Sequence, residues 1–87
     1  MENYKDMFAN INKIVLDVDP INLGGVPGEY DNQVNEIIKL INTKKSYKLQ
    51  SDEIYKIFYR SFADSITDDK SSFDAIATKI ANLEQSS

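Results

Sequence analysis

Apolar residues recur every three or four positions along most of this chain, which is the spacing of one buried face of an α-helix. Four segments show it, at residues 4–18, 32–42, 52–66 and 72–83, and a polar tail follows at 84–87. No segment alternates apolar and polar residues long enough to predict a strand. The apolar stripes consist of Tyr4, Met7, Phe8, Ile11, Ile14, Val15 and Val18; Tyr30, Val34, Ile37, Ile38 and Ile41; Ile54, Ile57, Phe58, Phe62 and Ile66; and Phe73, Ile76, Ala77, Ile80 and Leu83.

Short polar residues mark the expected helix starts. Asp31, Ser51 and Ser71 are each expected to act as an N-cap, because a short side-chain oxygen accepts from the free N–H groups of a first turn. The first helix should end before Pro20, because the residue preceding a proline is disfavoured in helical angles. Short connections let neighbouring helices pack side by side. The sequence therefore predicts one all-α domain, a bundle-like arrangement of four antiparallel helices.

The connection between the first two helices differs from the rest of the chain. Residues 17–31, DVDPINLGGVPGEYD, hold all three glycines, both prolines and four acidic residues, with no basic one. One interpretation is purely structural: glycines allow positive φ angles, Ile21, Leu23 and Val26 pack onto the helices, and carboxylates satisfy backbone N–H groups, as in an Ω-loop. The other interpretation is a binding surface.

Charge distribution favours a binding surface for a basic protein. Residues 14–38 contain five acids and no lysine or arginine, whereas residues 39–48 contain four lysines and no acid. A run of acids attracts a basic partner, and the net charge of −4 argues against nucleic acid. Tyr30 is included among the candidate contact residues, because tyrosine is enriched in protein interfaces. The candidate partner-binding residues are Asp17, Asp19, Glu29, Tyr30, Asp31 and Glu36.

Composition restricts the chemistry. The 87 residues include neither cysteine nor histidine, which excludes disulfides, His/Cys zinc sites and histidine-activated nucleophiles. A calcium loop starting at Asp17 would need oxygen ligands where Ile21 and Gly28 stand. Glu29 and Asp31 form a carboxylate pair, but no nucleophile accompanies them. We therefore expect no catalysis, no metal and no cofactor.

The location expected for the protein follows from hydropathy. No apolar run approaches the roughly 18 residues of a spanning helix, and MENYKDMF lacks the basic-then-apolar order of a signal peptide. A cytoplasmic protein without membrane contact is the expectation.

The loop also resembles a family. Asp19-Pro20, an apolar residue at Leu23, glycines and then Glu29-Tyr30-Asp31 opening a helix are similar to the pattern of the YugE-like proteins, small helical bacterial proteins of unknown function. That family often has proline after the Tyr-Asp pair, where this chain has asparagine. The resemblance implies a compact helical fold and no established enzyme activity. In size and charge the chain is also similar to the immunity proteins encoded beside bacterial toxins.

These observations give two functional hypotheses. The first is a non-enzymatic acidic binding protein, most concretely an immunity protein that neutralises a basic toxin domain by covering its active site or nucleic-acid groove. The alternative is a small regulatory or structural helical domain in which the loop serves only the fold. One version of this alternative is a homodimer.

Overall fold

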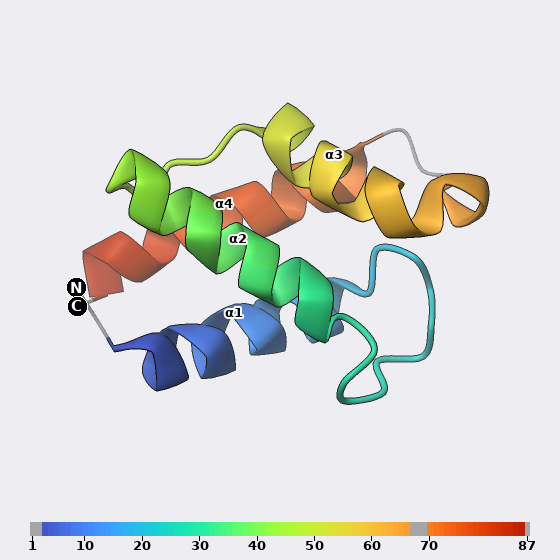
Figure 1. Ribbon diagram of the computed structural model, residues 1–87, viewed down its shortest axis with the longest axis horizontal. Helices are drawn as coiled ribbons and strands as arrows, with labels where there is room; N and C mark the ends of the chain where they lie inside the picture. Colours follow the sequence, from blue (N-terminus) through green and yellow to red (C-terminus); the bar gives the residue numbers. More distant parts are fainter. Residues whose placement is uncertain (1–2, 67–69, 87) are drawn as a thin grey trace.

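The structure is a computed structural model that describes residues 3–66 and 70–86, with side chains through residue 84. In this part of the chain four α-helices and one short 3-10 helix follow one another, and no strand occurs. Successive helices run in opposite directions (Figure 1). The prediction of an all-α, bundle-like domain is confirmed. The elements are α1 (Tyr4–Val18), α2 (Asp31–Lys44), α3 (Ser51–Phe62), η1 (Ala63–Ser65) and α4 (Ser71–Ser86).

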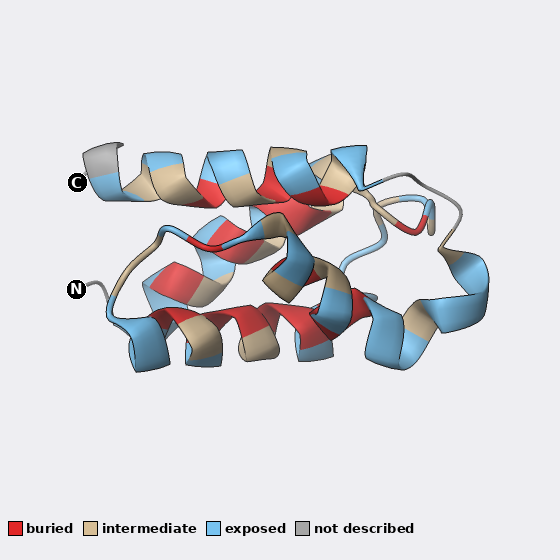
Figure 2. Ribbon diagram, turned by 90° about the horizontal axis from the view of Figure 1, so that it is seen from above, coloured by how far each residue is buried: buried red, intermediate tan, exposed pale blue. Residues whose placement is uncertain are grey.

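One hydrophobic core holds the helices together. Buried positions line the inward faces of the helices, and exposed positions occupy the outer faces (Figure 2). The largest fully buried side chains are aromatic, and isoleucine supplies most of the remainder. Each fully buried side chain of this size contributes about 1.5–3 kcal/mol relative to exposure. The largest fully buried residues are Tyr30, Phe58, Phe73, Ile11, Ile37, Ile38, Ile41, Ile54, Ile76 and Ile80.

Two helix starts differ from the prediction by one residue. Helix α2 begins at Asp31 itself, so the N-cap position belongs to Tyr30, and no side chain caps it. Helix α3 begins at Ser51, and its N-cap is Gln50, whose N–H donates to Glu53 Oε1 over 2.9 Å. The predictions that Asp31 and Ser51 are N-caps are therefore wrong. Both residues lie in a first turn, where acids and short polar side chains are also favoured.

Three other helix boundaries also differ from the prediction. Helix α4 begins at Ser71, and the Asp74 N–H donates to the Lys70 carbonyl over 2.9 Å, so the N-cap predicted at Ser71 lies one residue earlier. The third helix was predicted through Ile66, but its α-helical part ends at Phe62 and continues as η1. The tail predicted at 84–87 is helical through Ser86. The connection at 67–69 lies outside the described residues.

The two connections of α2 lie at opposite ends of the molecule. The loop 19–30 joins α1 to α2 at one end of the longest axis, and the α2–α3 connection lies at the other (Figure 1). The molecule measures 34 × 24 × 19 Å along its principal axes. Among the helices described, none combines the length and apolar content that a membrane span requires.

Candidate functional site

The loop 19–30 is organised around the carboxylate of Asp19. This residue ends α1 as its C-cap, in the left-handed region at φ 51°, with its N–H on the Val15 carbonyl. Its Oδ1 accepts from the Leu23 N–H over 2.9 Å, and its Oδ2 accepts from the Gly24 N–H over 2.9 Å. The Tyr30 hydroxyl donates to the same Oδ1 over 2.6 Å. One side chain therefore holds the start, the middle and the end of the loop together.

Tyr30 links this carboxylate to the core. Its exposed fraction is 0%, and its ring packs edge-on against Phe58 and Phe62, with centroids 5.8 and 5.9 Å away. The hydroxyl also accepts from the Ile21 N–H over 3.3 Å. A buried tyrosine hydroxyl generally needs such partners, and here the loop supplies both.

The ionisation of the pair reflects this contact. The Tyr30 hydroxyl, with the backbone N–H groups of the loop, holds the pKa of the Asp19 carboxyl below its usual value. Burial, reinforced by the bond to the Asp19 carboxylate, raises the pKa of Tyr30 to about 12. At neutral pH the pair is therefore a charged carboxylate that accepts from a neutral phenol, which is a strong type of hydrogen bond.

Backbone conformation explains the composition of the loop. Gly24 and Gly28 have φ angles of 91° and 94°, where other residues are strained. Asn22 is also left-handed, at φ 62°, and asparagine tolerates that region better than most residues. The structural interpretation of the glycines is confirmed.

The distal part of the loop presents exposed groups to solvent. Val26 is 49% exposed, and Glu29 and Asp31 are also exposed. Two turns connect this segment: the Glu29 N–H donates to the Val26 carbonyl, and the Asp31 N–H donates to the Gly28 carbonyl. We call Val26, Glu29 and Asp31 the acidic tip. The expectation that Val26 packs onto the helices is wrong, whereas Ile21 is buried and Leu23 packs against the core.

The six candidate residues separate into three groups. Asp19 and Tyr30 hold the loop together from inside, and the Tyr30 side chain is fully buried, so it does not lie on the loop surface. Asp19 is half-buried, and both of its oxygens are engaged. Glu29 in the loop and Asp31 at the start of α2 are both exposed and lie two positions apart in the chain.

The other two candidates lie on different faces. Asp17 is exposed on α1 and lines a groove between α1 and α4 together with Lys13 and Lys79. Glu36 lies on α2, and its carboxylate oxygens are 3.7 Å from the Lys39 ammonium and 3.8 Å from the Arg60 guanidinium. Neither residue is part of the acidic tip, so the sequence interval 14–38 does not form one continuous acidic surface.

The exposed groups of this site are two carboxylates and one aliphatic side chain. Within residues 3–66 and 70–86, no three acidic, histidine or cysteine side chains gather in a way that would hold a metal ion. Carboxylates and one aliphatic side chain on a fixed loop are suited to contact with a basic, partly apolar surface.

Comparison with known proteins gives no relative from which to transfer a function: no family model, curated protein or solved structure matches the chain. The resemblance to the YugE-like proteins therefore remains a prediction from the loop pattern.

Proposed function

We propose that the protein is a non-enzymatic binding domain that uses its acidic tip to dock onto a basic protein. The observation that carries this proposal is the exposed Val26, 49% accessible, beside the exposed carboxylates of Glu29 and Asp31. An exposed aliphatic side chain is a suitable anchor, because it can fill an apolar pocket of a partner. The flanking carboxylates supply charge complementarity at the rim of such a contact.

The order of the loop supports the same proposal. A flexible segment loses conformational freedom when it binds, and this loss reduces affinity. Here Asp19 fixes the loop through Leu23, Gly24 and Tyr30 before any partner arrives. The segment that carries Val26 and Glu29 is thus anchored on both sides to Asp19, which does not itself face the partner in this proposal. A residue can therefore be essential for binding without contacting the partner, and Asp19 and Tyr30 have that role in this proposal.

The concrete form that we propose is an immunity protein. Its acidic tip would contact lysines and arginines around the active site or nucleic-acid groove of a toxin domain, and the body of the bundle would block access. Acidic composition, small size and the exposed anchor support this form. The partner would then be the carboxyl-terminal domain of a protein encoded next to this one.

The test is co-expression with that neighbouring domain, followed by association-rate measurements at two salt concentrations. Glu29→Lys should slow association and flatten its salt dependence, because exposed charges act mainly through steering. Val26→Ser should leave the association rate unchanged and speed dissociation, because it removes the anchor. The control is Asp6→Lys, which makes the same charge change at the start of α1. If Glu29→Lys and Asp6→Lys behave alike, the acidic tip is not the contact surface.

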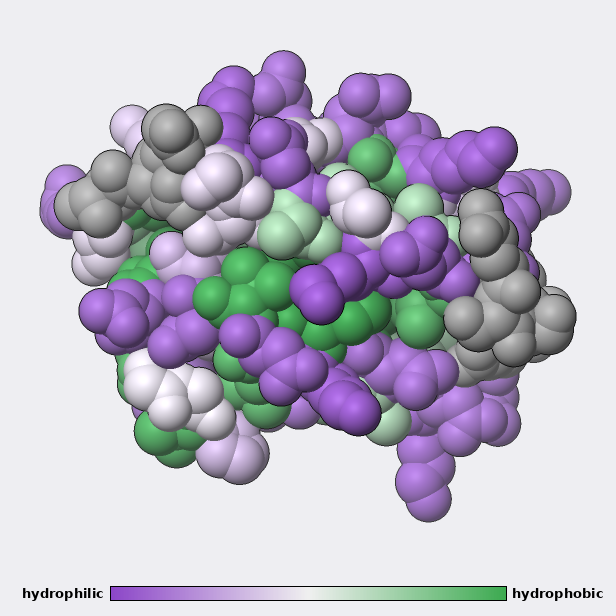
Figure 3. Space-filling view, turned by 180° about the vertical axis from the view of Figure 1, so that it is seen from behind, coloured by the Kyte–Doolittle hydropathy of each residue, from purple (hydrophilic) through white to green (hydrophobic). Residues whose placement is uncertain are grey.

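A second candidate function is a self-associating structural or regulatory domain, and a different face favours it. Figure 3 views the molecule from the side of α4 and shows hydrophobic side chains gathered in the middle of that face between hydrophilic margins. The groove of about 330 Å³ between α1 and α4 includes Ile14 and Leu83 among its lining residues. Sedimentation velocity distinguishes the two functions, because a dimer that Leu83→Lys dissociates would support self-association through this face.

A further inference from the structure

The groove between α1 and α4 is lined by three charged side chains: Lys13 and Asp17 of α1 and Lys79 of α4. The groove has a volume of about 330 Å³ and opens on the face shown in Figure 3. Among the residues that the structure describes, none of these three forms an ion pair. Charges of both signs therefore stand beside this groove without a partner in the described part of the chain.

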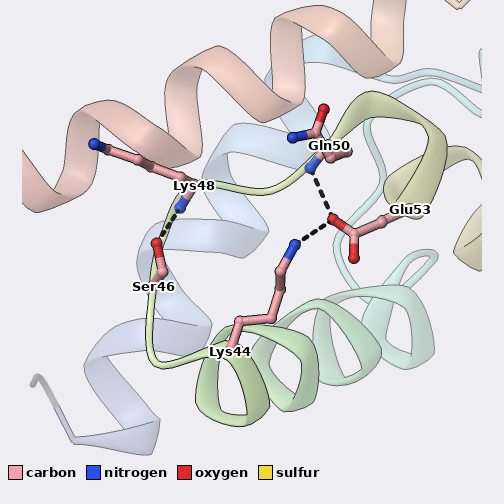
Figure 4. Close-up of polar contacts among 5 residues, drawn as sticks. All are labelled: Lys44, Ser46, Lys48, Gln50 and Glu53. Carbon is pink, nitrogen blue, oxygen red and sulfur yellow. Dashed lines mark hydrogen bonds and ion pairs between the residues drawn. The ribbon is translucent and has the colours of Figure 1, made fainter.

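A groove between α2 and α3 differs in this respect. The carboxylates that line it belong to Glu36 and Glu53, and both are engaged by cations of the same chain. The Lys44 ammonium is 2.6 Å from Glu53 Oε1, across the gap between α2 and α3 (Figure 4). Glu36 is 3.7 Å from the Lys39 ammonium and 3.8 Å from the Arg60 guanidinium. These contacts connect α2 to α3 within one molecule, whereas the carboxylate of the α1–α4 groove is available to another molecule.

Apolar side chains form the bottom of the α1–α4 groove. Ile14 is 9% exposed and belongs to the core, and Leu83 is half-buried and packs against that core. The face in Figure 3 shows the same order, with hydrophobic side chains in the middle and hydrophilic ones at the margins. An apolar centre with a charged rim is the usual arrangement of a protein–protein contact.

The charges on α1 are complementary to those of a second copy of α1. Lys13 and Asp17 are exposed four positions apart, with the lysine toward the amino end, which is the less favourable order for a pair within one helix. A twofold axis level with Val15 would place an antiparallel α1 so that each Lys13 lies opposite Asp17 of the other copy. The axis repeats every contact, so one match gives two ion pairs. A uniformly acidic partner would repel Asp17, and a uniformly basic one would repel Lys13.

We propose that two copies of this chain dimerise along the α1–α4 groove, with their α1 helices antiparallel and with two reciprocal contacts between Lys13 and Asp17. This inference rests on the second proposed function, self-association through the same face, and adds the geometry of the dimer. Ile14 and Leu83 of both copies form the apolar centre of the contact, and the ion pairs lie at its rim. Lys79 is not needed for this match, and the acidic tip does not line the groove.

The experiment is sedimentation velocity of the full chain over a range of concentrations, and the wild type is expected to dimerise. Lys13→Glu and Asp17→Lys should each raise the dimer dissociation constant about tenfold or more, because each variant replaces two ion pairs by two repulsions. Lys5→Glu is the control, because Lys5 is exposed on the same helix but does not line the groove. This control changes the net charge by the same amount as Lys13→Glu and should leave the dissociation constant unchanged.

Mixing the two variants tests the reciprocal geometry directly. The Lys13→Glu copy carries acids at both positions, and the Asp17→Lys copy carries lysines at both. A one-to-one mixture should therefore form a heterodimer about as tight as the wild-type dimer, although each variant alone is mostly monomeric. Recovery in the mixture also shows that both variants are folded. If circular dichroism shows both variants helical and the mixture does not recover, Lys13 and Asp17 do not face one another, and the proposal is overturned.

The geometry and the self-association itself fail in different ways. If Leu83→Lys dissociates a dimer while both charge reversals behave like Lys5→Glu, self-association through this face stands and the antiparallel arrangement of α1 is overturned. If the wild type remains monomeric at every concentration, both are overturned.

Discussion

Removing one oxygen atom from the core should destabilise this protein substantially. Tyr30→Phe keeps the ring between Phe58 and Phe62 but removes the hydroxyl that donates to Asp19 over 2.6 Å and accepts from the Ile21 N–H. A hydrogen bond to a charged group contributes about 1.5–3 kcal/mol, and a buried N–H left without an acceptor costs about 1 kcal/mol more. We therefore expect a loss of about 2.5–4 kcal/mol, from a total of only ~4–13 kcal/mol for a chain of this length.

The assay is urea unfolding followed by far-ultraviolet circular dichroism. The midpoint should fall while the denaturant slope stays constant, because the surface exposed on unfolding does not change. Tyr59→Phe is the matched control: that ring is 51% exposed, so the same atom removed there should change stability by no more than about 0.5 kcal/mol. A Tyr30→Phe loss as small as the Tyr59→Phe loss would refute the argument that the hydroxyl holds the loop.

A double-mutant cycle separates the contact itself from general damage. Asp19→Asn removes the charge but tolerates the left-handed backbone of this position. If the hydroxyl and the carboxylate act as one unit, the two substitutions together should cost 0.5–3 kcal/mol less than the sum of their separate costs. If the two losses of stability simply add, the Tyr30 hydroxyl and the Asp19 carboxylate have no interaction energy, and the prediction is contradicted.

Three further predictions concern pH and helix starts. Because the pKa of Tyr30 is raised to about 12, its contribution is present below pH 10 and is lost as pH rises through 12, so wild type should lose about 2 kcal/mol more than Tyr30→Phe between pH 10 and pH 12 in alkaline urea titrations. Asp31→Ala should cost only ~0.3–1 kcal/mol in thermal unfolding, because Asp31 acts through first-turn charge, and a loss above 1.5 kcal/mol would restore a capping role. Glu53→Ala should cost about 1–2 kcal/mol in urea unfolding, because it removes the bond to Gln50 and the ion pair with Lys44 together, and an unchanged midpoint would contradict this.

Helix positions were largely predictable from the sequence, but the starts of the last three α-helices were each predicted one residue late. The prediction for the first helix, residues 4–18, coincides with α1, because the Asp19-Pro20 pair imposes a clear stop. Three residues were predicted as N-caps but are the first residues of their helices: Asp31, Ser51 and Ser71. Short polar residues are favoured both at the N-cap and in the first turn. Only backbone angles and hydrogen bonds distinguish these positions.

The organisation of the loop was less accessible from the sequence. Tyr30 heads the apolar stripe of α2, so its burial was predictable, and a buried tyrosine requires a polar partner. That its partner is Asp19, eleven positions earlier, depends on how the chain closes in three dimensions. The charge pattern treated all acids of the interval alike, because formal charge does not show whether a carboxylate faces the solvent or the loop. The exposure of Val26 could not be predicted from the sequence, because a single valine between glycine and proline is compatible with a buried or an exposed position.

The opposite placement of the two α2 connections separates the acidic tip from a pair of exposed lysines along the longest axis (Figure 1). The acidic tip lies at one end, and Lys45 and Lys48 are exposed at the other end, in the connection to α3 (Figure 1). A charged surface would therefore turn the protein in solution before any contact forms, and it would do so over about the 8 Å screening length of physiological salt. A positively charged partner would meet the acidic tip first, whereas a negatively charged one would meet the lysine-bearing end, so the sign of the partner selects which end arrives.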